Sequence, residues 1–135
     1  MIDAESIVFT KLKYLITQYL IAQKYTKYNF STATPQTTIT TFPTIVIEQI
    51  DNSINGTNLE NDELSVGSAI KIEIYTNTDS ALSISREIAK VADSAMKTMN
   101  YKRIFGFAKI DNLTDATILK RVGRYSRTIS GGDTV

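Results

Sequence analysis

The sequence predicts an α+β domain in which a mixed β-sheet carries two helices on one face. Apolar residues recur at helical spacing in residues 3–23 and again in residues 78–100. Residues 44–50 are rich in β-branched side chains, and within residues 68–77 an isoleucine occupies every second position from 70 to 74. The order is α-β-β-α-β-β with no internal repeat, so residues 1–135 form one domain.

Residues 3–23 are predicted as the first helix because their apolar residues fall on one stripe. Asp3 or Ser6 is expected to cap this helix, since each side-chain oxygen can accept hydrogen bonds from free amides of the first turn. The spacings of three and four predict a single buried face. The residues of that face are Val8, Leu12, Leu15, Ile16, Tyr19 and Leu20.

Residues 26–41 show no helical period and are rich in threonine, which predicts a linker or an extended edge segment. Phe30 and Ile39 are expected to anchor this linker. Pro43 then opens the strand at residues 44–50, because proline lacks an amide donor and suits the start of a strand.

Residues 51–63 are predicted as a polar acidic loop, or as the tip of a long hairpin. Asn55 and Gly56 indicate a turn inside it, since both residue types tolerate positive φ. In the strand at residues 68–77, alternation puts Ile70, Ile72 and Ile74 on one side and Lys71, Glu73 and Tyr75 on the other.

The second helix is expected to begin at Thr78 or Asp79 and to end at Asn100, a residue that accepts a left-handed backbone. Its predicted buried stripe consists of Ile84, Ile88, Val91, Ala92, Ala95 and Met99. Two strands follow at residues 103–110 and 116–129. Imperfect alternation around residues 121–123 suggests a bulge or an edge position, and residues 130–135 are expected to form a flexible tail.

Composition argues against catalysis and cofactor binding. The chain has no histidine and no cysteine, so the usual base near neutral pH and the common zinc ligands are missing. No phosphate-binding glycine loop occurs, and the acidic cluster lacks the spacing of a calcium loop. We therefore predict no enzyme activity, no cofactor and no metal. With no signal peptide or membrane segment in view, we expect the protein to be made and assembled in a cytoplasm.

Charge is distributed unevenly along the chain. Residues 44–80 hold seven acidic residues against one basic, and residues 97–135 hold eight basic against three acidic. The simplest interpretation is a pair of solvated faces, or an edge strand that charge protects from aggregation. A sharper hypothesis is head-to-tail assembly, in which the acidic side of one subunit, including Glu73, meets the basic strand of the next. The predicted interface residues are Asp51, Glu60, Asp62, Glu63, Lys120, Arg121, Arg124, Tyr125 and Arg127.

Three stretches carry a resemblance to a known family. They are TFPTIVIEQIDNS (residues 41–53), GSAIKIEIYTN leading into SREIAKVADSAMKTMNYKRI, and the closing DATILKRVGRYSR. Together they resemble the tail terminator, or tail-completion, proteins of long-tailed bacteriophages over nearly the whole chain after the first helix. The shared features are element order, a proline-led strand, and an Arg-x-x-Arg-Tyr final strand.

The resemblance implies a structural virion protein that forms a hexameric ring at the head-proximal end of the tail. Such a ring caps the tail tube, stops its elongation and offers a docking surface to the head-tail connector. Its partners would be further copies of itself, the tube protein and the connector, with DNA only passing through and no membrane involved. Two alternatives remain: another neck component, such as a head-closure or adaptor protein, and a small nucleic-acid-binding module that uses the basic residues and Tyr125.

Overall fold

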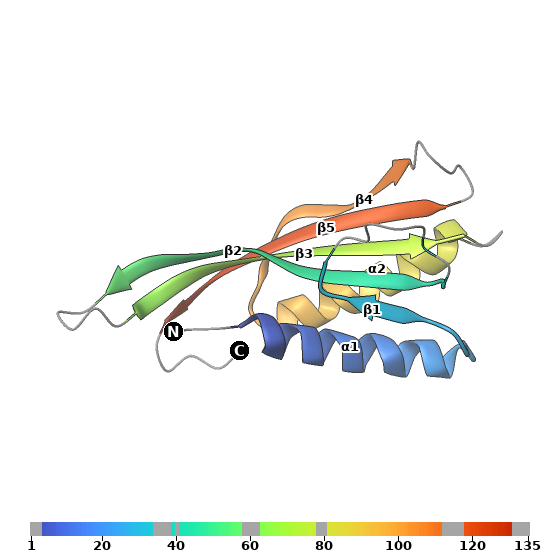
Figure 1. Ribbon diagram of the computed structural model, residues 1–135, viewed down its shortest axis with the longest axis horizontal. Coiled ribbons are helices and arrows are strands. Elements are labelled where there is room, and N and C mark those ends of the chain that lie inside the picture. Colours follow the sequence, from blue (N-terminus) through green and yellow to red (C-terminus); the bar gives the residue numbers. More distant parts are fainter. Residues whose placement is uncertain are drawn as a thin grey trace.

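The computed structural model describes residues 4–33, 39, 41–57, 63–77, 81–111 and 118–130. The elements in chain order are α1 (Glu5–Ala22), β1 (Asn29–Ser31), β2 (Thr44–Thr57), β3 (Glu63–Thr76), α2 (Ala81–Thr98), β4 (Lys102–Asp111) and β5 (Leu119–Ser130). The strands form one sheet in the order β1-β2-β3-β5-β4, and both helices pack on the same face of it (Figure 1). The predicted α+β class and helix placement are confirmed, and the short strand β1 is an addition.

Helix α1 packs by a stripe of four buried residues spaced four apart: Val8, Leu12, Ile16 and Leu20. Two details of the prediction are wrong. Ser6 lies inside the helix and its carbonyl accepts a hydrogen bond from Thr10, while the N-cap position is Ala4 with no side-chain cap. Leu15, expected in the core, is exposed because it lies beside the buried stripe rather than on it. Asp3 lies outside the described residues.

Both helices end in the same way, with a residue of positive φ and a pair of backbone hydrogen bonds. After α1, Lys24 has φ 65° and Tyr25 N–H donates to the carbonyl of Leu20. After α2, Asn100 has φ 63° and Tyr101 N–H donates to the carbonyl of Met96. This six-to-one bond is the Schellman stop, and it confirms Asn100 as the predicted end signal.

The sheet is mixed, since β1 runs parallel to β2 and the other neighbours are antiparallel. Strands β2 and β3 form a hairpin whose pairing continues to Thr57 and Glu63. Residues 51–63 were predicted as a loop or as the tip of a long hairpin. Residues 51–57 and Glu63 are strand, so the hairpin alternative is confirmed. Residues 58–62 lie outside the described part. The β2–β3 hairpin and the end of β5 project beyond the helical layer (Figure 1).

The core lies between the helices and one face of the sheet. Ile72 on β3 and Ile88 on α2 are fully buried there, as their alternation and helical spacing predict. The isoleucine row of β3 packs against the small-residue side of α2, where Ala92 and Ala95 let the helix approach the sheet closely. The core is therefore continuous from α1 through α2 to the sheet.

A second, smaller apolar cluster covers part of the opposite face of the sheet. It consists of Val46, Tyr75 and Ile118, with Ile39 and Phe42 packed against it. Within residues 26–41, residues 29–31 form the edge strand β1, which agrees with the extended-edge form of the prediction, and Ile39 anchors the chain as expected. Phe30 also contacts the main core. Residues 34–38 and 40 lie outside the described part, as do residues 131–135 of the expected tail.

Strand β5 lies between β3 and β4, so the edge interpretation of residues 121–123 is wrong. The irregular pairing is in β4 instead. Register shifts occur between Arg103 and Phe105 and again between Phe105 and Ala108, opposite the regular strand β5. The imperfect alternation of β5 suggested a bulge in that strand, but the bulges occur in its neighbour β4.

Candidate interaction surface

Strand alternation divides the basic residues of β5 between the two faces of the sheet. Arg121 and Tyr125 stand opposite Ile74 and Ile70 of β3, on the face that the helices cover. Lys120 and Arg124 stand opposite Tyr75 and Lys71, on the face turned away from both helices, which we call the open face. The basic residues that are close in sequence therefore do not form one continuous ladder.

Arg121 is a buried structural residue, with only 9% of its surface exposed. Its Nε donates to Ser85 Oγ of α2 at 3.1 Å, and its Nη1 donates to the carbonyl oxygen of Phe107 on β4 at 3.1 Å. Burial lowers the pKa of the Arg121 guanidinium, and the nearby charge of Arg86 lowers it further. Arg121 thus links α2, β4 and β5. The prediction that its side chain faces a partner is wrong, because the side chain is buried.

Tyr125 is also buried, and its ring belongs to the main core. Its hydroxyl donates a 2.6 Å hydrogen bond to Asp93 Oδ1 of α2. Burial raises the pKa of Tyr125, and the hydrogen bond and negative charge of Asp93 raise it further. The prediction of Tyr125 as an interface residue is corrected, because a ring enclosed in the core offers no surface for a partner or for base stacking.

The carboxylate of Asp93 contacts three side chains, which come from three different elements. Besides Tyr125 of β5, its carboxylate meets Lys97 Nζ at 3.0 Å and Arg103 Nη1 of β4 at 3.7 Å. Burial acts to raise the pKa of Asp93, but the hydrogen bonds from Tyr125 and Lys97 and the charges of Lys97 and Arg103 outweigh it and hold the pKa below its ordinary value. Asp93 is therefore an ionised link between α2 and the β4–β5 pair.

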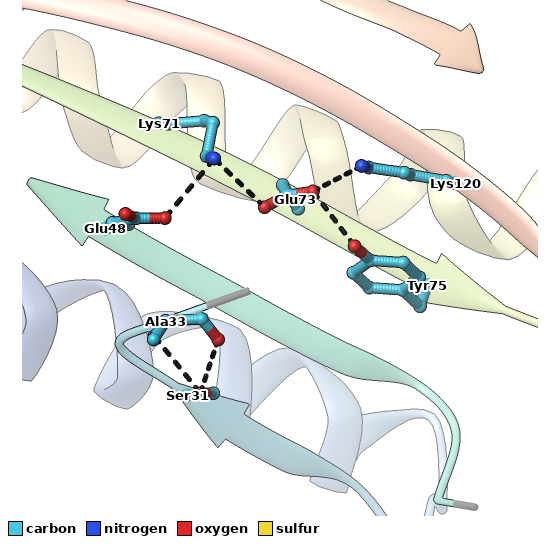
Figure 2. Close-up of polar contacts among 7 residues, drawn as sticks. All are labelled: Ser31, Ala33, Glu48, Lys71, Glu73, Tyr75 and Lys120. Carbon is cyan, nitrogen blue, oxygen red and sulfur yellow. Dashed lines mark hydrogen bonds and ion pairs between the residues drawn. The ribbon is translucent and has the colours of Figure 1, made fainter. Parts of the chain in front are cut away.

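On the open face, Glu73 is the centre of an intramolecular charge network (Figure 2). Glu73 is 1% exposed, and its carboxylate lies 2.7 Å from Lys120 Nζ and 3.4 Å from Lys71 Nζ. Lys71 also meets Glu48 at 3.3 Å, and the Tyr75 hydroxyl donates to Glu73 at 2.9 Å. Burial raises the pKa of Tyr75, with a further rise from the bond and charge of Glu73.

This network changes the charge hypothesis. Glu73 and Lys120 were both expected to face an adjacent subunit, but each meets its opposite charge inside the same chain. A buried carboxylate needs such partners, because desolvation without them costs several kcal/mol. Glu73 is therefore not an acidic contact for a neighbour, and Lys120 is occupied by it.

Arg124 is the basic residue of β5 whose side chain remains most open to solvent. It is exposed on the open face, and within the described part of the chain its side chain makes no hydrogen bond or ion pair. Arg127 is half-buried on the helical face, where its Nη1 donates to the carbonyl of Met99 at 2.8 Å. Asp51 is exposed on β2. Glu63 begins β3, while Glu60 and Asp62 lie outside the described residues.

The sequence reasoning missed the Glu73 and Asp93 networks. For Glu73 a signal was present: a lone acid on a strand between two alternating isoleucines, with lysines at Lys71 and Lys120. For Asp93 the signal was weaker, because its partners come from three elements that are distant in sequence.

Within the described residues, neither helix combines the length and apolar character needed to cross a membrane. In the same part of the chain, three or more potential metal ligands never come together. A scan of the sequence against protein-family models finds no match, and a search of curated proteins finds no relative. Inferences about function therefore depend on the residues themselves.

Proposed function

We propose that this protein is a structural subunit of a phage tail. Several copies form a ring that caps the tail tube, stops its elongation and offers a docking surface to the head-tail connector. The proposal is supported by the resemblance of residues 41–53 and of the final strand to tail terminator proteins. A helix-backed sheet with charged residues on part of its open face and a projecting hairpin also suits a subunit that works by docking.

The observation that carries the proposal furthest is the projecting arm. Strands β2 and β3 stay paired to Thr57 and Glu63, and β5 accompanies β3 as far as Ser130. Both helices lie beside the other end of the sheet, so this three-stranded arm extends past them (Figure 1). A protruding β-structure can reach across to a neighbouring subunit, which a compact domain without an arm cannot do.

The charged residues indicate which surface of a neighbouring subunit the arm contacts. Asp51 lies on β2 near the base of the arm, and Glu63 begins β3. In the sequence, Glu60 and Asp62 fall between these two strands. Arg124 lies on the open face of β5, away from its own arm tip. In a head-to-tail arrangement, the acidic arm of one subunit meets Arg124 of the next. A contact between two different patches repeats around a closed rotation, and so produces a ring.

The test is charge reversal at Arg124. In native mass spectrometry and sedimentation at low salt, we expect the wild-type chain to form a ring and Arg124→Glu to shift it toward monomers. Low salt matters because the screening length is about 10 Å at 0.1 M ionic strength and longer below it. Lys90→Glu, a reversal at an exposed position of α2, is the matched control and should leave the ring intact.

A second experiment asks whether the acidic side of the contact lies near Asp51. Adding Asp51→Lys to Arg124→Glu should restore part of the ring, because the swapped charges attract again. All four proteins should unfold at similar denaturant concentrations, which separates assembly from folding. If Arg124→Glu and Lys90→Glu assemble equally well at low salt, the charge-directed ring is refuted.

A further inference from the structure

Helix α1 is apolar on two opposite sides. One side is the buried stripe that packs on the core. On the other side, Ile7, Tyr14 and Ile21 are 42%, 63% and 56% exposed. These residues are spaced by seven, close to two helical turns, so they form a line along the outer surface of α1. A helix with apolar residues on both sides is typical of one that is covered on both sides.

Tyr14 stands at the centre of this line, between two hollows in the surface. One groove, of about 420 Å³, lies between α1 and α2 and is lined mainly by apolar atoms, including Leu15, Ala95 and Met99. The other, of about 380 Å³, lies on the far side of Tyr14 beside Phe9 and Lys13. The same surface thus carries one protruding ring and a hollow on each side of it.

We propose that this outer face of α1 binds the same face of a second copy of the chain, in an antiparallel arrangement with its two-fold axis at Tyr14. Ile7 and Ile21 are each seven residues from Tyr14, so the axis places Ile7 against the partner's Ile21 at both ends. Each Tyr14 ring lies beside the other and enters a groove of the opposite helix. The surface is self-complementary, as a two-fold contact requires.

The flanking polar residues agree with this partner. In an antiparallel pair, residues on the same side of the two helices meet each other. On one side, Lys11 lies level with the partner's Gln18, whose amide oxygen accepts a hydrogen bond from an ammonium group. On the other side, Thr10 lies level with the partner's Thr17. Lys13 is the exception, because it lies one residue from the axis and is therefore level with the partner's Lys13. This like-charge pair at the flank weakens the contact.

The area that two copies of α1 can bury limits how tightly the two copies bind. Helix α1 has 18 residues, which corresponds to about 27 Å at ~1.5 Å per residue. One pair of helices this long buries less than the roughly 1,600 Å² of a standard stable interface. The two-copy form should therefore dissociate on dilution. The inference does not depend on the ring proposed above, because it uses a different surface, and each can fail alone.

Cysteine cross-linking tests the arrangement, since the chain has no cysteine of its own. A residue on a two-fold axis meets itself, and a disulfide needs Cα atoms within about 7 Å. Under mild oxidation, we expect Tyr14→Cys to form covalent dimers at least tenfold faster than Lys90→Cys, an exposed control on α2. Ile7→Cys and Ile21→Cys should each fail to dimerise alone but should cross-link when mixed.

Three results would overturn the proposal. One is a Tyr14→Cys rate no higher than that of Lys90→Cys. Another is self-linking of Ile7→Cys, which indicates a parallel pair. The third is unchanged sedimentation of Tyr14→Glu at concentrations where the wild type dimerises. Because Tyr14 is exposed, its variants should fold, and equal unfolding midpoints would establish that. Arg124→Glu should cross-link at position 14 normally, which separates this contact from the ring.

Discussion

Replacing Tyr125 by phenylalanine removes one hydroxyl from the core and leaves the ring in place. The lost bond is a 2.6 Å hydrogen bond to the carboxylate of Asp93. Hydrogen bonds to charged groups contribute about 1.5–3 kcal/mol. Asp93 keeps Lys97 and a side-chain exposure of 18%, so water and lysine compensate in part. We therefore expect the free energy of unfolding to fall by about 1.5 kcal/mol at pH 7.

The stability lost in Tyr125→Phe should depend on pH. The folded pKa of Asp93 lies below its ordinary value of 3.8, so its stabilising effect is complete above that value and is lost as pH falls through the folded pKa. Tyr125→Phe removes one of the bonds that lower the pKa. The stability difference between wild type and variant should therefore be largest near neutral pH and should shrink in acid.

Urea unfolding at pH 7 and near pH 2.5 measures both effects, with the slope unchanged if the native state stays compact. Tyr14→Phe is the matched control, because it deletes a hydroxyl from an exposed ring and should change stability by less than about 0.5 kcal/mol. A double-mutant cycle with Asp93→Asn should yield a coupling energy above about 0.5 kcal/mol. A loss equal to that of the control, or one independent of pH, would refute the role assigned to the Tyr125–Asp93 bond.

Two further predictions concern packing. Ile72→Ala and Ile88→Ala should each lower the free energy of unfolding by about 2–5 kcal/mol, and losses below about 1 kcal/mol at both would contradict their core positions. Gly123→Ala should cost about 1–3 kcal/mol, because a Cβ there would lie 2.9 Å from the Phe107 ring. The same glycine change should cost much less in a Phe107→Leu background, and an equal cost in both backgrounds would exclude the ring as the cause.

Much of the fold could be predicted because its main elements follow simple periods. The row Ile70, Ile72 and Ile74 alternates on β3, and the stripe containing Ile88 repeats at helical spacing on α2. For strand β1 the sequence predicted only a linker or an extended edge segment somewhere in residues 26–41, because three residues are too short for a strand period to show. Its position depends instead on pairing with β2.

The interaction surface was harder to predict, for a physical reason that Arg121 and Arg124 illustrate. They are three residues apart and chemically identical, yet alternation puts one under α2 and the other in solvent. Applying the strand period to β5 would have separated them. It would not have revealed that Ser85 and Phe107 accept hydrogen bonds from Arg121, since those partners come from distant parts of the chain.

Electron microscopy of tail tubes tests the central proposal most directly. The tube protein of the same virion would be polymerised alone and with this chain added in excess. We expect a ring of several copies, six by the resemblance to tail terminators, on one end of each tube, and growth that stops after its addition. Tubes with bare ends that keep growing at the same rate in the presence of the protein would contradict the account.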